Sequence, residues 1–326
     1  MTMYRVAKHA GFGNVVVEET AIPVPGPREV VVRSHISLIS RGSEILRRYM
    51  HEEAIDPAIM GYSVGGVVSA AGSEAAAQFA PGLRVTATAP HAQYVVQDMD
   101  ALEGTRIWPV PDRLSFEQAA FVPLCTGAVS WAACSGVQPG DTVVVVGQGL
   151  VGNLVLQALR AYDPGRLIAV DTLPLRLGLA ETVGADVVID AGAGDPVAQV
   201  HELTAGRGAQ VVVDCVGGQA GLQSFAQAQD MVADLGTLHL IGLYHGAPLP
   251  LDAGKIQRRR IVGGYYGAPD RKQMTAQAVT MLQDEAIQVA PLITHRVAFR
   301  DAPAAYDLLY NSPDTAMGVL LVWMDD

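Results

Sequence analysis

The clearest chemical signal in the chain is a glycine-rich turn directly after an apolar run. The stretch VVVVGQGLVG carries Gly147, Gly149 and Gly152 at the spacing G-x-G-x-x-G. After a buried strand, the first glycine allows a tight turn, the second lets a pyrophosphate approach the backbone, and the third lets a helix pack closely on the strand. The N–H groups of Leu150 and Val151 at the helix start then face the phosphates, where the helix dipole favours negative charge. The stretch predicts a dinucleotide site.

An acidic residue at the end of the next strand strengthens this prediction. Asp171 closes the apolar run RLIAVD, about 20 residues beyond the glycines, which is the distance typical of the residue that binds the adenosine ribose. A carboxylate there accepts hydrogen bonds from the ribose hydroxyls and repels a 2′-phosphate, so NAD is favoured over NADP. Arg176, one helical turn further on, softens that preference. A structural glycine turn without a ligand is the alternative.

Residues at the ends of two later strands are expected to complete the cofactor site. In parallel sheets, ligands bind outside the carboxyl ends of the strands. Val216 and Gly217 follow the run VVVDC, and Gly242 and Leu243 follow LHLI. Tyr244 and His245 come next and are candidates for reaching a substrate.

The elements that position these residues fall into two groups. Up to about residue 115, short β-rich runs broken by Gly and Pro predict a small barrel or sandwich of antiparallel strands. From Asp141 onward, apolar strands alternate with amphipathic helices, which predicts a doubly wound parallel sheet. We expect an α/β fold with a β-rich catalytic domain at 1–117, a C-terminal return to it at 290–326, and a Rossmann domain at 118–289.

Composition narrows the class of protein. The 326 residues include 22 basic and 33 acidic ones, and the net charge of -11 disfavours nucleic acid and anionic lipid as partners. Apolar runs end before the roughly 18 to 20 residues of a membrane span, and we find no secretory signal, so a soluble cytoplasmic protein is expected. Cys125, Cys134 and Cys215 form no C-x-x-C pair, which argues against disulfides and a four-thiolate zinc lobe.

The order of these parts resembles the medium-chain dehydrogenase/reductase superfamily, which includes zinc alcohol and polyol dehydrogenases and zinc-free quinone and enoyl reductases. The stretches that carry the resemblance are PGPREVVVRSHISLISRGSE, PAIMGYSVGGVV, GDTVVVVGQGLVG and VVVDCVGG. The resemblance implies a GroES-like β-rich domain, a residue against the nicotinamide at Thr126, at the start of a helix, and a homodimer joined through the strand IVGGYY. In a chain this acidic, the neighbouring basic run 257–260 is expected to be a solvated edge, and an anion-binding patch is the alternative.

The zinc ligands of that superfamily are missing from the matching positions. The ligand cysteine of C-G-[ST]-D corresponds to Arg41 in R-G-S-E, and the ligand histidine of G-H-E corresponds to Tyr62 in G-Y-S. The third position falls near Val122. None of these side chains suits zinc. We therefore expect no catalytic zinc. A site rebuilt around His51 is the alternative, although its spacing matches no known ligand pattern.

Without a cation, hydrogen-bond donors or a general acid must stabilise the developing oxyanion. Ser43 matches the hydroxyl relay of the zinc alcohol dehydrogenases, or is a turn serine. Tyr62 is either a proton donor or a pocket wall. Arg41 and Glu44 either form an ion pair in the former metal space, or Arg41 binds a substrate anion. His35 and His91 are weaker candidates, since either can be structural.

The sequence thus predicts a zinc-independent NAD(H)-linked oxidoreductase that interconverts a secondary alcohol and a ketone. R-G-S-E and G-Y-S-V-G-G resemble the branch of polyol, cyclitol and bacteriochlorophyllide alcohol dehydrogenases. One rival is a zinc-free enoyl or quinone reductase, against which Asp171 counts because those enzymes commonly prefer NADPH. The other is a nucleotide-binding protein without catalysis.

Overall fold

The computed structural model describes residues 1–243 and 246–324, which form two compact units. The first unit contains Met1–Thr126, Arg271–Glu285 and Leu292–Asp326, and the second contains Gly127–Asp270 and Ala286–Pro291. The division runs through helix α2 (Phe116–Ser135), so it falls later than the boundary at 117/118 expected from the sequence. A continuous helix gives no turn signal, which explains the difference.

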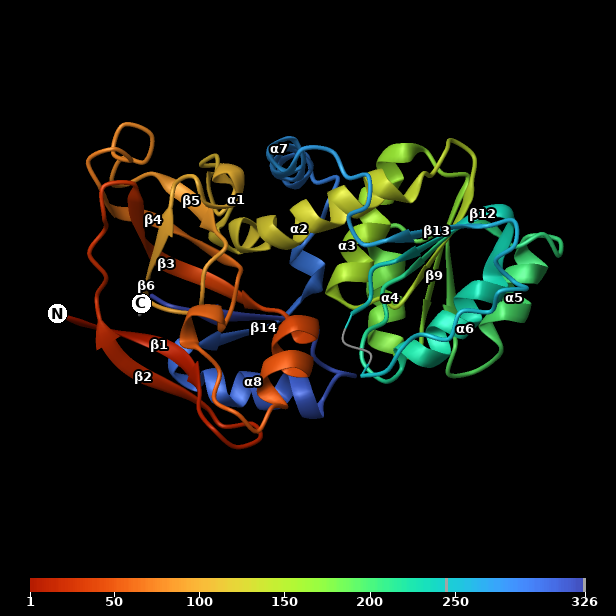
Figure 1. Ribbon diagram of the computed structural model, residues 1–326, viewed down its shortest axis with the longest axis horizontal. Coiled ribbons are helices and arrows are strands. Elements are labelled where there is room, and N and C mark those ends of the chain that lie inside the picture. Colours follow the sequence, from red (N-terminus) through yellow and green to blue (C-terminus); the bar gives the residue numbers. More distant parts are fainter. Residues whose placement is uncertain (244–245, 325–326) are drawn as a thin grey trace. The chain divides into compact units, whose positions relative to one another are not determined.

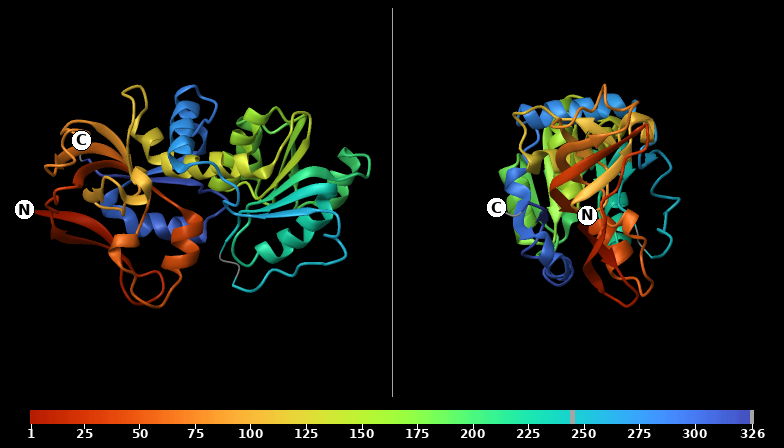
Figure 2. Two further views of the ribbon diagram at one scale, coloured as in Figure 1. Left: turned by 45° about the horizontal axis from the view of Figure 1, so that its top comes forward. Right: turned by 90° about the vertical axis from the view of Figure 1, so that its left-hand side faces the viewer.

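The first unit is built on a mostly antiparallel sheet, as predicted from its short strands. The strand order is β14-β15-β3-β4-β5-β7, with β6 also paired to β3 (Figure 1). A separate two-stranded ribbon is formed by β1 and β2, drawn in red in Figure 1 and Figure 2. The strands are β1 (Thr2–Lys8), β2 (Val15–Ala21), β3 (Glu29–Ile39), β4 (Val64–Ala71), β5 (Arg84–Ala87), β6 (Tyr94–Asp98), β7 (Ile107–Pro109), β14 (Ile293–Ala298) and β15 (Gly318–Val322).

The last strand ties the C-terminal segment into this sheet. β15 pairs antiparallel with β3, so that Leu320 lies opposite Leu38. Helix α8 (Ala302–Asn311) packs its apolar face on the same core, in which Tyr306 is completely buried. Fully burying one large apolar side chain contributes about 1.5 to 3 kcal/mol. The other helical segments of this unit are η1 (Arg41–Tyr49), η2 (Pro57–Ile59), α1 (Ala101–Gly104), α7 (Arg271–Gln283) and η5 (Phe299–Asp301).

The second unit is a doubly wound parallel sheet, in agreement with the prediction. Its strand order β10-β9-β8-β11-β12-β13 puts β9 and β10 on one side of β8 and β11, β12 and β13 on the other. The strands are β8 (Thr142–Val146), β9 (Arg166–Asp171), β10 (Val187–Asp190), β11 (Ala209–Asp214), β12 (Val232–Leu240) and β13 (Arg260–Gly263). The helical segments are α3 (Leu150–Leu159), η3 (Arg160–Tyr162), α4 (Pro174–Thr182), α5 (Pro196–Leu203) and α6 (Gly221–Met231), and η4 (Ala290–Leu292) straddles the division.

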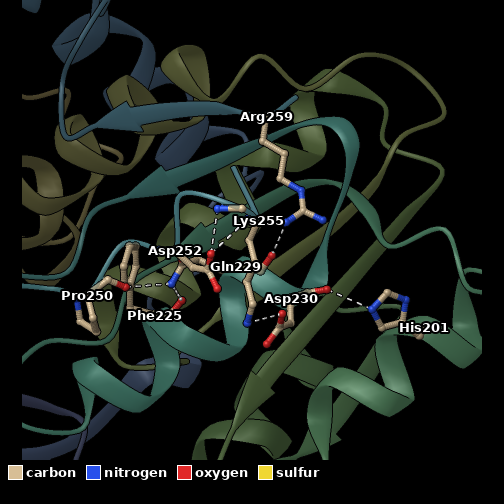
Figure 3. A network of polar contacts seen from close by, with 9 residues as sticks. His201, Phe225, Gln229, Asp230, Pro250, Asp252, Lys255 and Arg259 are labelled. Atoms are coloured by element: carbon tan, nitrogen blue, oxygen red, sulfur yellow. Dashed lines mark hydrogen bonds and ion pairs between the residues drawn. The ribbon is translucent and has the colours of Figure 1, made fainter. Parts of the chain in front are cut away.

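Figure 3 shows how the connection between β12 and β13 is held on the end of α6. The buried side-chain amide of Gln229 donates to the Pro250 carbonyl at 3.2 Å and accepts the Asp252 N–H at 2.9 Å. Lys255 pairs with Asp230 at 2.6 Å, and the guanidinium of Arg259 donates to the Gln229 carbonyl at 2.7 Å. A cation at the carboxyl end of a helix satisfies its last carbonyls and favours the dipole.

The basic run at 257–260 therefore has internal partners as well as an exposed face. Arg258 pairs with Asp234 at 2.9 Å, and both side chains are more than half exposed. Arg260 donates to the carbonyls of Cys134 and Ser135, at the carboxyl end of α2. The expectation of a solvated edge thus holds for Gln257, Arg258 and Arg260, which are exposed, and Arg259 and Arg260 also cap helices. No sequence motif indicated these tertiary partners.

All three cysteines are free thiols, and Cys125 and Cys134 are buried. Within residues 1–243 and 246–324, no helix combines the length and apolar character that crossing a membrane requires.

Candidate active site and nucleotide site

The glycine-rich turn joins β8 to α3, and each glycine has the local geometry that the motif predicts. Gly147 has φ +86°, a conformation that L side chains rarely adopt. A Cβ on Gly152 would lie 1.7 Å from the Gly147 carbonyl oxygen, so the helix packs directly on the turn. Gly149 caps α3, and a Cβ there would meet no atom within 4 Å. Open backbone at a helix N-terminus suits a pyrophosphate.

Asp171 is oriented toward this turn. Its carboxylate Oδ2 accepts the backbone N–H of Gln148 at 2.6 Å, and Oδ1 accepts the N–H groups of Thr172 and Leu173 at 2.7 and 3.0 Å. Nη1 of Arg176 lies 3.6 Å from Oδ2, and the Asp171 side chain is only 5% exposed. The carboxylate is therefore held in place before any ribose binds, and Arg176 offsets part of its charge.

The remaining residues predicted for the cofactor follow strands that end at the same edge of the sheet. Asp214, the last residue of β11, lies opposite Val146 of β8 and Leu240 of β12. A Cβ on Gly217 would lie 2.5 Å from the Leu243 carbonyl oxygen, so the segments after β11 and β12 touch. A Cβ on Gly147 would lie 2.6 Å from Cγ2 of Val216, so the turn and the segment after β11 also touch. Tyr244 and His245 lie outside the described residues.

Thr126 lies in the middle of α2 and not at the start of a helix, contrary to the expectation from the resemblance. It is buried, and its hydroxyl donates to the Val122 carbonyl at 2.8 Å. Helix α2 continues through Pro123 and includes Thr126. A proline inside a helix removes one backbone donor and introduces a steric clash, which usually ends or kinks the helix.

The three positions that correspond to zinc ligands hold residues with other partners. Nε of Arg41 donates to the Leu309 carbonyl at 3.1 Å, and the Tyr62 hydroxyl donates to Oγ of Ser40 at 2.7 Å. Val122 is a buried aliphatic side chain. In the part of the chain that the structure describes, no three His, Cys, Asp or Glu side chains gather as metal ligands would. This donor set does not fit zinc, which prefers thiolate, imidazole and carboxylate ligands.

Glu44 is the centre of a buried polar network in the first unit. It is completely buried, and its Oε1 accepts the backbone N–H of Ser40 at 2.9 Å. Its Oε2 lies 3.0 Å from Nε2 of His91 and accepts a hydrogen bond from the Tyr306 hydroxyl. These partners, rather than the expected Arg41, surround the carboxylate. His91 is also bonded through Nδ1 to Ser37 at 2.8 Å, so it has the structural role considered for it.

The network keeps Glu44 ionised. Burial alone would raise the pKa of the Glu44 carboxyl. The charge and hydrogen bond of His91, together with the bonds from Ser40 and Tyr306, outweigh burial and lower that pKa below its ordinary value. A buried carboxylate that accepts several hydrogen bonds is stable only while its partners stay in place. Glu44 is therefore an ionised carboxylate held inside the first unit.

Local backbone geometry accounts for the position of this network. The chain leaves β3 and enters the π-helix η1, a form that is rare and often found at functional sites. Gly61 has φ +105°, and a Cβ there would lie 2.8 Å from the ring of His91. The glycine of G-Y-S is thus needed to admit His91. Ser43 is half-buried on η1, and its hydroxyl has no hydrogen-bond partner among the described residues.

Sequence reasoning missed Ser40 and Tyr306 as parts of this site. Ser40 directly precedes the R-G-S-E stretch and lacks any motif of its own, and Tyr306 lies in the amphipathic stretch APAAYDLL near the C-terminus. The one available signal was the polar hydroxyl of Tyr306 on the apolar face of that helix, because a buried phenol usually has a hydrogen-bond partner.

Comparison with known proteins finds relatives among dehydrogenases. The family described as zinc-binding dehydrogenase matches residues 151–284. An alcohol dehydrogenase of Cupriavidus necator is 29% identical over 71% of this chain, and the match spans 62% of that protein's length. Human sorbitol dehydrogenase is 26% identical over 91% of this chain and 90% of its own length.

Solved structures share the fold. An Escherichia coli oxidoreductase/dehydrogenase of unknown specificity has a TM-score of 0.87, with 20% identity and full coverage of both chains. An Escherichia coli alcohol dehydrogenase complexed with NADH has a TM-score of 0.83, with 19% identity over 98% of this chain and 99% of its own. A dehydrogenase of Sinorhizobium meliloti bound to NADP has a TM-score of 0.82, with 22% identity over 99% of each chain. Residues 151–284 are thus similar to the zinc-binding dehydrogenase family, and the whole chain shares the fold of solved dehydrogenases.

Proposed function

We propose that the protein is a zinc-independent, NAD(H)-dependent oxidoreductase that interconverts a secondary alcohol and a ketone. One observation carries this proposal. The positions that hold zinc in the resembling enzymes hold Arg41, bonded to a helix carbonyl, and Tyr62, bonded to Ser40. The phenol at the second ligand position is a hydrogen-bond donor and a proton donor, so it supplies part of what the cation would supply.

The proposed chemistry assigns separate tasks to the residues of the first unit. The nicotinamide, when bound, supplies the hydride for ketone reduction or accepts it in alcohol oxidation. Tyr62 donates a proton to the substrate oxygen in reduction and accepts it in oxidation. Ser43, whose hydroxyl is unengaged among the described residues, is the second donor to that oxygen. Glu44 holds the backbone at Ser40, from which Tyr62 is positioned.

The cofactor residues of the second unit fit a dinucleotide and favour NAD over NADP. The bare backbone at Gly149 and the α3 N-terminus suit the pyrophosphate, and Val216, Gly217, Gly242 and Leu243 border the same sheet edge. The Asp171 carboxylate disfavours a 2′-phosphate, although Arg176 at 3.6 Å weakens that repulsion. Structures of the same fold are described with NADH and with NADP. Thr126 remains a proposed contact of the nicotinamide.

We also propose a homodimer formed through β13, the last strand of the parallel sheet. An unpaired edge strand exposes backbone donors and acceptors, which pairing with a second copy would satisfy. Tyr266 follows this strand and is 79% exposed, and Tyr265 is 50% exposed. Size-exclusion chromatography with light scattering checks this part of the proposal, and a monomer at micromolar concentration contradicts it.

The function is tested with the purified full-length chain, NADH or NADPH, and two matched substrate panels. One panel holds cyclic and acyclic ketones with the corresponding secondary alcohols, and the other holds enones and quinones. We expect ketone reduction with NADH and no loss of activity after chelation of divalent metals. Turnover of enones or quinones alone with NADPH would favour the reductase alternative. Tight NADH binding without any turnover would favour a protein that has lost catalysis.

Metal content is measured on the same preparation. Elemental analysis is expected to find zinc well below one atom per chain. One tightly held zinc per chain, lost together with activity on chelation, contradicts zinc independence.

A further inference from the structure

Ser40 uses its hydroxyl in an unusual way for its position. It is the residue that caps the start of η1, where serine is common because its side-chain oxygen accepts an N–H of the first turn. Ser40 makes no such capping bond. Its hydroxyl instead lies 2.7 Å from the hydroxyl of Tyr62. The side chain is therefore directed at the proposed proton donor and not at its own helix.

The buried network fixes the backbone at Ser40. The Glu44 carboxylate accepts the Ser40 N–H at 2.9 Å, and the Ser40 carbonyl accepts the Glu44 N–H at 2.8 Å. Glu44 is in turn held by His91 and Tyr306, which come from distant parts of the sequence. Since Ser40 is also only 5% exposed, its hydroxyl oxygen has little freedom to move away from Tyr62.

We propose that Ser40 is the positioning residue that stabilises Tyr62 when it loses its proton, an inference that rests on the proposed function. Both groups are hydroxyls, so either can donate. With Ser40 as the donor, the phenol O–H is released toward the substrate oxygen. During reduction, the carbonyl carbon receives the hydride and the carbonyl oxygen receives the Tyr62 proton. The O–H bond of the phenol breaks, its electron pair stays on the phenol oxygen, and water later returns a proton.

The stabilisation arises from the charge that forms on the phenol oxygen. A hydrogen bond to an ionised acceptor is shorter and stronger than one between neutral groups. Ser40 therefore binds the phenolate more tightly than the phenol, which makes Tyr62 a better acid. In alcohol oxidation the same bond holds the phenolate that accepts the substrate proton. Removing the Ser40 hydroxyl weakens both directions.

The test measures the acidity of Tyr62 without any substrate. The full-length chain is labelled with ¹³Cζ-tyrosine and titrated by NMR, and Tyr62→Phe identifies the Tyr62 signal by its loss. We expect Ser40→Ala to raise the titration midpoint of Tyr62 by about one pH unit, which is a tenfold change in acidity. Ser40→Thr keeps a hydroxyl at this position and should leave the titration midpoint of Tyr62 at its wild-type value. Ser34 is a buried serine of β3, the strand that directly precedes Ser40. Ser34→Ala is the matched control and should leave the midpoint of Tyr62 unchanged.

Ser40→Cys, similar in size but a weak donor, serves if Ser40→Ala does not fold, and it should shift the midpoint in the same direction. An unchanged midpoint in folded Ser40→Ala or folded Ser40→Cys overturns the proposal. So does a shift of the same size in Ser34→Ala. On any ketone that the enzyme reduces, Ser40→Ala should lower kcat about tenfold with little change in KM, and unchanged kcat contradicts the proposal. The NMR result stands even if no ketone is turned over, so failure of the proposed function is recognised separately.

Discussion

The carboxylate of Asp171 accepts the backbone N–H of Gln148 at 2.6 Å, which joins the end of β9 to the glycine-rich turn. Gln148 lies between Gly147 and Gly149, so the acid proposed to select the ribose also holds the loop proposed to receive the pyrophosphate. The proposal thus couples cofactor choice and loop geometry through a single side chain.

Replacing Asp171 with alanine should weaken NADH binding at least tenfold and NADPH binding much less. The ribose loses a charged acceptor in both cases, but NADPH also loses a repulsive neighbour of its 2′-phosphate. Calorimetric titration of both cofactors checks this. Asp190→Ala, at the end of the neighbouring strand β10, is the control and should change neither affinity. Equal losses for the two cofactors would remove the role assigned to Asp171.

Replacing Arg176 with alanine should sharpen the preference for NADH. Its guanidinium lies 3.6 Å from the Asp171 carboxylate, and both side chains are largely buried. Without the cation, the uncompensated carboxylate repels a 2′-phosphate more strongly, so the ratio of NADPH to NADH dissociation constants should rise several-fold. The same titrations measure this ratio. A fall in the ratio would mean that Arg176 does not attract the phosphate.

Replacing Glu44 with glutamine should destabilise the first unit by about 3 kcal/mol near neutral pH, because an amide cannot accept all the hydrogen bonds of the buried carboxylate. Urea denaturation followed by tryptophan fluorescence measures the loss. Glu18→Gln is the control, since Glu18 pairs with Arg5 at a partly exposed site and should cost less than about 1 kcal/mol.

The loss caused by Glu44→Gln should depend on pH in a defined direction. The folded state lowers the pKa of Glu44, so its contribution is complete above the ordinary value of 4.5 and disappears as pH falls through the lowered pKa. The difference between wild type and variant should therefore be constant at higher pH and shrink in acid. A difference that grows as pH falls would contradict an ionised Glu44.

Replacing Leu235 with asparagine should stabilise the protein by about 1 kcal/mol. Leu235 has φ +62° and is 74% exposed, so it combines an unfavourable backbone conformation with a side chain that gains little from burial. Asparagine tolerates this conformation better than leucine. Thermal and urea unfolding measure the gain. Leu235→Ala keeps the unfavourable backbone conformation and should bring no such gain. If alanine stabilised the protein as much as asparagine does, the gain would come from removing the exposed leucine side chain and not from the backbone conformation.

The sequence by itself determined the fold of the second unit and the local geometry of its glycine-rich turn. Alternating apolar strands and amphipathic helices predicted the parallel sheet, since both periodicities are local properties of the chain. The glycine motif predicted the conformation at Gly147, the open backbone at Gly149 and the close packing at Gly152, because only the absence of a Cβ permits them.

Only the tertiary structure decided what surrounds the candidate site residues of the first unit. The sequence suggested that Arg41 and Glu44, three residues apart, form an ion pair. In the fold, Glu44 is bound by His91 and Tyr306. These partners are far away in the sequence, and β15 and α8 bring the C-terminal segment onto the core of the first unit. Local periodicity carries no information on such pairings. They depend on which buried polar groups can satisfy one another once the sheet has formed.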